Sequence, residues 1–473
     1  MAGMASLLTI LLAATSVYAA LDVDLDSANS IQSAAKVVAK NLLSYYHGDE
    51  PGQIPGILPG PPDSGRGPYY WWEGGALWGT MVDYWHYTND TTYNAITTQA
   101  LVFQSENSYQ PRNWTGSMGN DDKGFWAMSA MLAAEVGFPD PPPDQPQWLA
   151  LAQGVFNQLA GGWETTYCAG GLRWQAVWAN NGIDYKNTIP TAILFNLGAR
   201  LARYTGNETY AMWAEKSWDW LVGVGYVDDE FNVYDGAHYQ NNCTEINKAQ
   251  FSYNAATLIE GLAYMHSFTS SESTTTPNKW QAPLTSLTNR TLTFFFPEGI
   301  IIERPCELPT TVGCNTDQLS FKGYMHRWLA TSTQLAPFLA PTILAALRSS
   351  TAGAVKACTA EGTCGFRWTT GEYDGSTGAG QQMSALAALV SLLVGGEGVG
   401  KPLTGVTGGT SVGDPGAGNG HVAVVGELAP VTTGDRAGAG VVTAVLCLSL
   451  VAGVVWMAMD ETVPVMKRGK GKE

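Results

Sequence analysis

The chain has 473 residues, of which 45% are hydrophobic and only 14% are charged, and its formal net charge is −16. This length is sufficient for one large hydrophobic core, and the acidic charge argues against a partner bound through phosphate groups, so no nucleic-acid partner is expected. The low charge and the 17 tryptophans are typical of an extracellular protein with aromatic platforms.

The first twenty residues, 1–20, have the pattern of a cleaved secretory signal peptide. An apolar stretch runs from Leu7 to Ala14, and the small residues of "VYA" at 17–19 form a cleavage site. The alternative is a membrane anchor, but the apolar stretch is short for a span. We therefore expect the mature chain to enter the secretory pathway.

Between residues 21 and 395 the apolar residues recur with helical spacing, and the alternation typical of strands is scarce. We interpret this region as one domain. The predicted helices, about twelve, lie at 28–46, 71–87, 90–106, 122–137, 147–160, 187–204, 207–223, 248–267, 280–295, 316–331, 335–349 and 378–394. Short strands are expected in the long loops near 171–174 and 231–234.

A repeated joint indicates how the helices are organised. "YTNDTTY" at 87–93 and "YTGNETY" at 204–210 each connect a very apolar helix to a more amphipathic one. Repetition of one helical-hairpin joint is the mark of a repeat architecture. The pattern predicts an all-α fold, an (α/α)6 barrel of six helical hairpins, with an α-solenoid as the alternative. Long loops after alternate helices should gather at one rim, which favours a closed barrel with a pocket there.

Two adjacent aspartates, Asp121 and Asp122, begin one of the apolar helices in "GNDDKGFWAMSAMLAAE". One interpretation is helix capping, because Asp and Asn are preferred at a helix start and complement its dipole. The helix is apolar on all faces, however, so its start is expected at the rim of a buried inner helix. Adjacent carboxylates reach the roughly 5–5.5 Å separation of retaining glycosidases more easily than the roughly 6.5–9.5 Å of inverting ones. The pair therefore also fits a nucleophile and an acid/base catalyst, since close carboxylates split their titration.

Polar and aromatic residues also cluster at the starts of other predicted inner helices, in "YYWWEGGALWG", "GIDYKNTIP", "QFSYNAATLIEG" and "CNTDQLSFKGY". Each cluster alone is explained by helix caps and core aromatics. Together they have the composition of a carbohydrate site, with rings that stack on sugar faces and polar groups that bind hydroxyls. The candidate substrate-binding residues are Trp71, Trp72, Glu73, Asn120, Trp126, Asp184, Tyr185, Asn187, Tyr253, Asn254 and Asp317.

Glycosylation signals and cysteines agree with secretion. The N-x-[ST] sequons are at Asn89, Asn113, Asn207, Asn242 and Asn289. Six of the seven cysteines lie in the predicted domain, and an even count favours disulfides. Cys306–Cys314 and Cys358–Cys364 would close short loops, which leaves Cys168–Cys243, although fifteen pairings are formally open. The cysteines and histidines show no metal-binding spacing, so no metal site is expected.

The C-terminal part predicts a membrane anchor. Residues 396–440 are rich in Gly, Thr and Val and read as a flexible stalk. Residues 441–459 carry no charge and are long enough to span a bilayer, and the basic tail 460–473 favours a transmembrane helix. A GPI signal, with attachment near Gly434 and Asp435, is the alternative. In both cases the domain would be tethered at the outer face of the plasma membrane or in the cell wall.

Several long segments resemble glycoside hydrolase family 76, the mannan endo-1,6-α-mannosidases and the related fungal cell-wall proteins held at the plasma membrane. The resemblance covers about 21–393. The segments are "WWEGGALWGTMVDYWHYTND", "GNDDKGFWAMSAMLAAE", "GGLRWQ", "DYKNTI", "CNTDQLSFKGYMHRW" and "YDGSTGAGQQMSAL". The resemblance implies an (α/α)6 barrel, no metal or other cofactor, and cleavage of α-1,6-mannose linkages with retention. Asp121 resembles the nucleophile of the family and Asp122 its general acid/base.

The resemblance also implies the partners. These are α-1,6-linked mannan or the mannose core of a GPI glycan, with cell-wall glucan as an acceptor if the enzyme is a transglycosidase. The charged tail departs from the GPI-anchored members of the family. Two further hypotheses are a non-catalytic mannoside-binding scaffold and a structural adhesion domain. The first predicts mannoside affinity without turnover, and the second predicts no affinity.

Overall fold

The structure of the protein, a computed structural model, describes residues 19–114, 117–270, 278–419 and 433–460. The chain divides into two compact units, residues 1–422 and 423–473. Nearly all of the expected signal peptide lies outside the described residues, so its cleavage stays a prediction.

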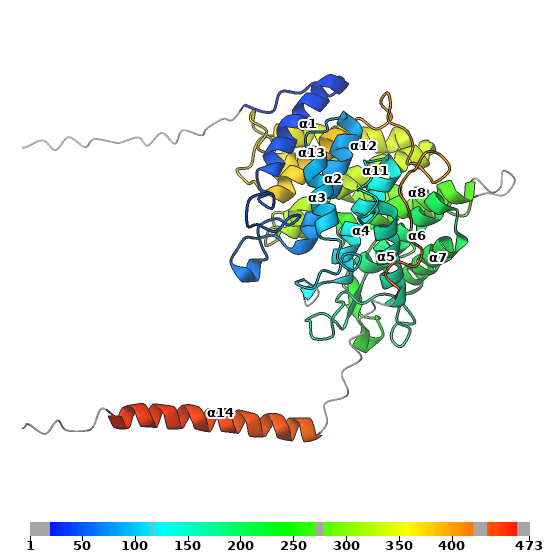
Figure 1. Ribbon diagram of the computed structural model, residues 1–473. Coiled ribbons are helices and arrows are strands. Elements are labelled where there is room, and N and C mark those ends of the chain that lie inside the picture. Colours follow the sequence, from blue (N-terminus) through cyan, green and yellow to red (C-terminus); the bar gives the residue numbers. More distant parts are fainter. Residues whose placement is uncertain (1–18, 115–116, 271–277, 420–432, 461–473) are drawn as a thin grey trace, which may run out of the picture. The chain divides into compact units, whose positions relative to one another are not determined.

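Six helices form a closed inner ring in the first unit. All six are labelled in Figure 1. Each packs against its two neighbours, and the last returns to the first. In order around the ring they are α2 (Trp71–Thr88), α4 (Asn120–Val136), α6 (Thr188–Thr205), α8 (Ser252–Ser270), α11 (Phe321–Leu335) and α13 (Ala379–Ser391). Side chains on nearly every face of these helices are buried, which explains why their sequences are apolar all round.

Six further helices cover the ring from outside. They are α1 (Ala28–Leu43), α3 (Asn94–Phe103), α5 (Trp148–Gly161), α7 (Glu208–Gly223), α9 (Gln281–Phe295) and α12 (Ala340–Lys356). Each packs on the inner helix before it in the chain, except α1, which precedes the others and packs on α13. Burial on one face only explains their amphipathic sequences. The closed ring confirms the predicted (α/α)6 barrel over the solenoid.

Short helical turns complete the barrel between the long helices. They are η1 (Pro62–Ser64), η3 (Tyr239–Asn241), η4 (Pro297–Gly299), α10 (Arg304–Glu307), η5 (Asp317–Ser320), η6 (Pro337–Leu339) and η7 (Trp368–Thr370). Four long helices, α3, α8, α11 and α12, begin four or five residues later than predicted. For α3 and α11 the reason is local. Asp90 accepts a hydrogen bond from the Thr92 N–H at 2.9 Å and holds a turn ahead of α3. The residues before α11 form the tighter η5.

Helices α2 and α4 approach closely because α2 carries two consecutive glycines. A Cβ on Gly75 would lie only 2.8 Å from the Trp126 ring, and a Cβ on Gly74 only 2.9 Å from it. The indole of Trp126 therefore fills the space that larger side chains would occupy. This contact sets the position of the start of α4 relative to α2.

A two-stranded sheet lies in the loops. Strand β1 (Tyr185–Asn187) pairs antiparallel with β2 (Gly236–His238), with Tyr185 opposite His238. The strands expected near 171–174 and 231–234 are not formed as strands. Those segments contribute single bridges instead, Arg173 with Lys186 and Val227 with Val233, so the prediction located the right loops but not the right residues.

The disulfides are those favoured by loop length. Cys168 is bonded to Cys243, Cys306 to Cys314 and Cys358 to Cys364. Among the described residues the remaining cysteine, Cys447, is free and lies in the C-terminal helix.

The sequon asparagines are all exposed, as a glycosylated residue must be. Asn89, Asn113, Asn207 and Asn242 lie in turns or at helix ends, and Asn289 lies within α9. Their modification stays a prediction.

The barrel domain extends further than the predicted boundary at residue 395. The Leu403 N–H donates to the backbone oxygen of Glu135 at 2.6 Å, and Ser411 Oγ accepts from the N–H of Leu149 at 3.0 Å. Asn157 Nδ2 donates to the Ala417 oxygen at 2.8 Å. Residues 401–419 thus run over the barrel surface and are not a free stalk. Of the rest of the predicted stalk, residues 420–432 lie outside the described residues, and residues 433–440 belong to a helix, not to a flexible segment.

The second unit contains one described helix, α14 (Thr433–Asp460). Its segment Arg436–Met457 is 22 residues long and contains an 18-residue stretch with a mean hydropathy of 2.3, so it is long and apolar enough to cross a membrane. Segment Pro337–Lys356 meets the same criteria of length and composition, but it includes α12 of the barrel and is 44% buried. Helix α14 thus fits the predicted anchor at 441–459. Nearly all of the tail 460–473 lies outside the described residues.

Charged side chains from five inner helices meet in the core of the ring. Arg200 of α6 donates to Glu135 of α4 at 2.6 and 3.0 Å and lies 3.9 Å from Glu260 of α8. Arg327 of α11 pairs with Asp83 of α2. All five side chains are at least nine-tenths buried. Their pairing offsets the desolvation of the charges and ties the ring together.

The buried pairs make a stability prediction. Arg200→Met should lower the free energy of unfolding by about 3–5 kcal/mol, because it leaves Glu135 charged and buried without its partner. Arg348→Met is the control, since Arg348 binds Asp26 at the same 2.6 Å but the two side chains are 47% and 81% exposed. Its loss should cost at most about 1 kcal/mol. Urea unfolding of the full chain measures both, and equal losses would contradict a special role for the buried pair.

Candidate active site

The candidate site is a cavity of about 410 Å³ at the end of the ring where the inner helices begin. It is lined by Tyr70, Trp72, Ser117, Asp121, Asp122, Phe125, Trp174, Gln175, Tyr185, Asn187, Asp235, Tyr253, Asp317 and Phe321. These residues come from the first turns or N-caps of α2, α4, α6, α8 and α11 and from the loops between them. The positive ends of several helix dipoles therefore point toward the cavity, which favours negative charge there.

Asp121 and Asp122 lie together in the first turn of α4. Gly119 is the N-cap, and its N–H donates to Asp122 Oδ2 at 2.8 Å, so the capping interpretation holds for Asp122. A Cβ at Gly119 would collide with Asp121 Oδ1, so the backbone can approach the carboxylate this closely only at a glycine. Both aspartates line the cavity as well, so capping is not the whole account of the pair.

Asp121 is partly unpaired. Its Oδ2 accepts a hydrogen bond from Trp174 Nε1 at 3.2 Å. Its Oδ1 is buried and has no hydrogen-bond partner within the described parts of the chain. A buried carboxylate oxygen without a partner is costly, so it marks a site prepared for another group.

Burial is the main influence on the ionisation of the pair. It raises the pKa of Asp121 well above the ordinary value, and the charge of Asp122 raises the pKa further, while the Trp174 N–H lowers it. Burial also raises the pKa of Asp122, to about 6, against the lowering effect of the Gly119 N–H. Because neither carboxylate ionises easily beside the other, the pair keeps one proton in mildly acidic solution.

Two further carboxylates line the cavity. Asp317 accepts a hydrogen bond from Trp72 Nε1 at 3.3 Å, and burial raises its pKa to about 6. Asp235 accepts the Tyr185 hydroxyl at 2.7 Å, and burial raises its pKa as well. The lining contains four aspartates and, among the described residues, neither lysine nor arginine. The cavity is therefore acidic.

Aromatic rings supply the remaining walls. Tyr253 stacks on Phe321 with ring centroids 4.0 Å apart, and Trp72 lies against Phe125 at 4.6 Å. Tyr70 and Trp174 are 43% and 37% exposed at the mouth. Carboxylates beside accessible rings match the hydroxyl and C–H faces of a sugar.

Seven of the thirteen predicted catalytic or substrate-binding residues are brought together. They are Asp121, Asp122, Trp72, Tyr185, Asn187, Tyr253 and Asp317. The others do not line the cavity. Trp71 and Trp126 turn into the core, where their rings stack at 5.2 Å and Trp71 Nε1 donates to Gln104 at 2.9 Å. Adjacent positions on a helix point about 100° apart, so Trp71 and Trp72 cannot share one role.

The remaining predicted residues have structural partners or lie in the core. Glu73 accepts the Tyr70 N–H at 3.0 Å and caps α2. Asn120 donates to the Arg173 oxygen at 2.9 Å and so holds the neighbouring loop. Asp184 accepts from His238 and Gln240 on the rim, and Asn254 is fully buried in α8. These four side chains lie outside the cavity lining.

Sequence reasoning missed seven lining residues, which are Tyr70, Ser117, Phe125, Trp174, Gln175, Asp235 and Phe321. Trp174 and Gln175 belong to the segment "GGLRWQ", whose likeness to the family was the available signal. Asp235 lies directly before β2 and had no comparable signal, since it reaches the cavity only because β2 pairs with β1.

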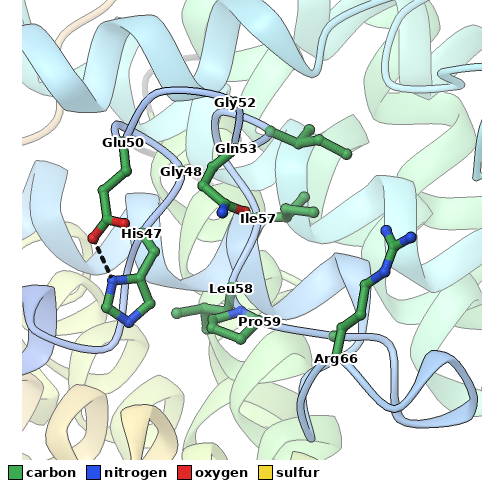
Figure 2. A pocket seen from close by; sticks show the side chains of 11 residues that line it. His47, Gly48, Glu50, Gly52, Gln53, Ile57, Leu58, Pro59 and Arg66 are labelled. Atoms are coloured by element: carbon green, nitrogen blue, oxygen red, sulfur yellow. Dashed lines mark hydrogen bonds and ion pairs between the residues drawn. The ribbon is translucent and has the colours of Figure 1, made fainter.

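A second, wider hollow of about 760 Å³ lies in the loop between α1 and α2 (Figure 2). Its charged groups are His47, Glu50 and Arg66, and His47 lies 2.9 Å from Glu50. The lining has no aromatic platform and no carboxylate pair within the described residues. The cavity at α4 is therefore the better candidate. Within the described ranges, no cluster of three or more His, Cys, Asp or Glu side chains suits a metal ion.

Comparison with known proteins agrees with this geometry. The sequence model of glycosyl hydrolase family 76 matches residues 30–404. Mannan endo-1,6-alpha-mannosidase DCW1 of Saccharomyces cerevisiae is 42% identical over 449 residues, which are 93% of this chain and 95% of that protein. Mannan endo-1,6-alpha-mannosidase DFG5 of the same yeast is 39% identical, over 93% of this chain and 94% of that protein.

Solved structures share the fold. Dfg5 from Chaetomium thermophilum, crystallised in complex with glucosamine, superposes with a TM-score of 0.79 and 49% identity, over 84% of this chain and 97% of that chain. The alpha-1,6-mannanase GH76A of Salegentibacter sp. HEL1_6, as an inactive variant with two consecutive aspartates replaced and in complex with alpha-1,6-mannotriose, has a TM-score of 0.62 at 14% identity. It covers 77% of this chain and 99% of that chain. By the extent of the family match and the identity of its relatives, the chain belongs to glycosyl hydrolase family 76.

Proposed function

We propose that this glycoside hydrolase is a retaining endo-α-1,6-mannosidase, in which Asp121 is the nucleophile and Asp122 the general acid/base. The observation that carries the proposal is the pair of adjacent, half-buried carboxylates in an acidic and aromatic cavity. Burial keeps one proton on the pair, and retaining hydrolysis needs one ionised and one protonated carboxyl. The names of the relatives support an α-1,6-mannoside as substrate.

The reaction has two steps in this proposal. Asp121 attacks the anomeric carbon and forms a glycosyl ester, while the bond to the leaving oxygen breaks and Asp122 gives that oxygen its proton. In the second step Asp122, now ionised, takes a proton from a water or sugar hydroxyl. The oxygen of that group attacks the anomeric carbon and releases Asp121. Trp174 stabilises the ionised form of Asp121 through its N–H.

The acceptor in the second step decides the biological role. With water the protein is a mannosidase, and with a sugar hydroxyl it is a transglycosidase that joins GPI-linked mannoproteins to cell-wall glucan. The substrate would be α-1,6-mannan or the mannose core of a GPI glycan. Exposed rings at the mouth, Tyr70 and Trp174, are placed to stack on sugar units outside the cavity. Helix α14 would hold the enzyme at the outer face of the plasma membrane or in the wall.

Substitution of the pair tests the catalytic assignment. Asp121→Asn should abolish turnover of an α-1,6-mannan oligosaccharide, because the amide is no nucleophile. Asp122→Asn should lower kcat by about 10²–10⁴-fold through loss of acid–base catalysis. Asp63→Asn, which changes an exposed aspartate in η1, should leave kcat unchanged. Circular dichroism checks that each variant is folded, and full activity in either pair variant would refute the assignment.

Product analysis tests retention. The newly formed reducing end should appear first as the α-anomer in proton NMR spectra, since two inversions at one carbon restore its configuration. An initial β-anomer would show single displacement by water. Mass spectrometry of the same mixture identifies the acceptor: products longer than the substrate indicate transfer, and shorter products alone indicate hydrolysis.

Trp174 provides a pH test. Trp174→Phe keeps a ring but removes the N–H that favours ionised Asp121, so the pKa of Asp121 should rise further. The nucleophile must be ionised, and the acidic limb of the kcat/KM profile should therefore move to higher pH. Trp178→Phe changes a ring that stacks on Arg173 and does not line the cavity, and it should leave this limb in place. An acidic limb at its original pH in Trp174→Phe would rule out the proposed support by the indole.

A further inference from the structure

Asp317 is one of two carboxylates outside α4 that line the cavity of Asp121 and Asp122. It begins η5, directly before α11, and lines the same cavity as Asp122. Trp72 Nε1 donates to its Oδ1 at 3.3 Å, and among the described residues this is the hydrogen bond that its side chain receives. Asp317 thus brings negative charge into the cavity without a cationic partner.

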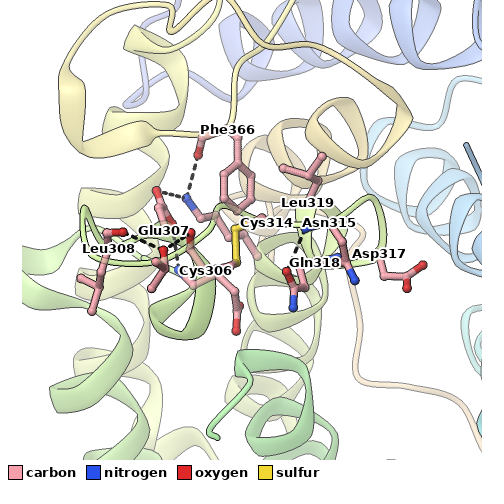
Figure 3. Close-up of a disulfide and its surroundings, with 12 residues drawn as sticks. Cys306, Glu307, Leu308, Cys314, Asn315, Asp317, Gln318, Leu319 and Phe366 are labelled. Atoms are coloured by element: carbon pink, nitrogen blue, oxygen red, sulfur yellow. Dashed lines mark hydrogen bonds and ion pairs between the residues drawn. A yellow bond between two sulfur atoms is a disulfide. The ribbon is translucent and has the colours of Figure 1, made fainter.

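The chain holds Asp317 in place from both sides (Figure 3). The Cys306–Cys314 disulfide closes the preceding loop. Asn315 and Gln318 then exchange hydrogen bonds, each from a backbone N–H to the side-chain oxygen of the other, at 2.9 and 3.0 Å. In Figure 3 the carboxylate of Asp317 points away from the disulfide and from these bonds. Its position is therefore fixed without use of the carboxylate itself.

On the far side, a buried ion pair anchors this loop to the first turn of α11. Lys322 Nζ lies 2.7 Å from Glu307 Oε1 and donates to the Phe366 oxygen at 2.7 Å. Both charged side chains are almost fully buried. Asp317, three residues after Cys314, thus lies in a segment that is anchored at both ends. A charge that acts at a fixed distance needs such an anchored position.

Several titratable or charged groups surround Asp122. They are Asp121 and Lys123 on α4, Tyr70 at the start of α2, Tyr185 and Asp235 at the two-stranded sheet, Tyr253 on α8 and Asp317 on η5. Burial raises the pKa of Glu73, which caps α2, and the charge of Asp317 raises that pKa further. Burial raises the pKa of Asp122 to about 6, the Gly119 N–H lowers it, the charge of Asp317 raises it, and the charge of Lys123 lowers it.

We propose that Asp317 is a positioning residue for the catalytic proton, whose negative charge keeps that proton on Asp122 until the leaving oxygen accepts it. This inference rests on the proposed function of Asp122 as the acid/base. It differs from a role in binding a sugar hydroxyl, because it acts through Asp122 and changes the pH range of activity.

The sign of the effect follows from the two ionisations. Below pH of about 6 Asp317 takes up a proton itself, since its pKa is raised to about 6, and its influence fades. Above that pH it is ionised, and a second negative charge on Asp122 is then disfavoured. Asp317 therefore keeps Asp122 protonated up to a higher pH. The alkaline limb of the pH profile of kcat/KM consequently lies at a higher pH than it would without Asp317.

The test is the pH dependence of kcat/KM of the full chain for an α-1,6-mannan oligosaccharide. Asp317→Asn keeps an acceptor for Trp72 but removes the charge, and the alkaline limb should move to lower pH by about one unit. Asp235→Asn is the matched control, because Asp235 lines the same cavity but its Oδ2 is already bound by two donors, the Tyr185 hydroxyl at 2.7 Å and Asn247 Nδ2 at 3.2 Å. The alkaline limb of Asp235→Asn should stay at the original pH, even if the variant has a different kcat.

An unchanged alkaline limb in Asp317→Asn, or a change in KM alone, would overturn the inference and leave Asp317 as a sugar-binding group. Equal shifts in the two variants would overturn it as well, because they would show a general effect of cavity charge.

A second measurement does not depend on turnover. The infrared carbonyl band of protonated Asp122 is identified by its absence in Asp122→Asn, and its titration is followed in Asp317→Asn. The band should disappear at lower pH than in the unmodified chain, and identical titrations would overturn the inference. If the protein proves inactive on mannosides, the proposed function fails, but this titration still tests the coupling of Asp317 to Asp122.

Discussion

Negative charge is buried at one end of a closed ring of helices, and the rest of the site depends on this burial. Asp121, Asp122, Asp235 and Asp317 share one cavity that no lysine or arginine lines within the described residues. Helix N-termini around the cavity provide partial positive charge, which makes such a concentration of carboxylates tolerable. Because burial raises the pKa of these groups, a proton stays available where a glycosidic oxygen would need it.

The ring must close accurately for the carboxylates to meet, and the core beneath them has its own charge network. Phe125 lines the cavity and also a small internal space with Arg200, Glu260 and Arg327. A displaced inner helix would leave one of these charges unpaired in the core, at a cost of several kcal/mol. We interpret the network as the element that fixes the order and height of the inner helices, and so the separation of groups in the cavity above.

The helices could be predicted from the sequence, because inner helices are apolar on all faces and outer helices on one face. The candidate catalytic pair could also be predicted, from the motif that contains Asp121 and Asp122. It could not separate Trp72 from Trp71, since helix rotation decides which of two neighbours faces the cavity. The place of Asp235 in the cavity could not be predicted, because it depends on the pairing of two strands that are far apart in the sequence. The segment 401–419 lacks any apolar period and attaches largely through hydrogen bonds to backbone groups, which no side-chain pattern encodes.

Covalent trapping tests the central claim, the division of roles within the pair, most directly. A 2-deoxy-2-fluoro mannoside with a good leaving group slows both steps, so a retaining enzyme accumulates its glycosyl ester. The account predicts that the intact mass of the full chain rises by one sugar unit and that peptide mapping places the sugar on Asp121. A label on Asp122, or no label while the α-1,6-mannoside is still cleaved, would contradict it.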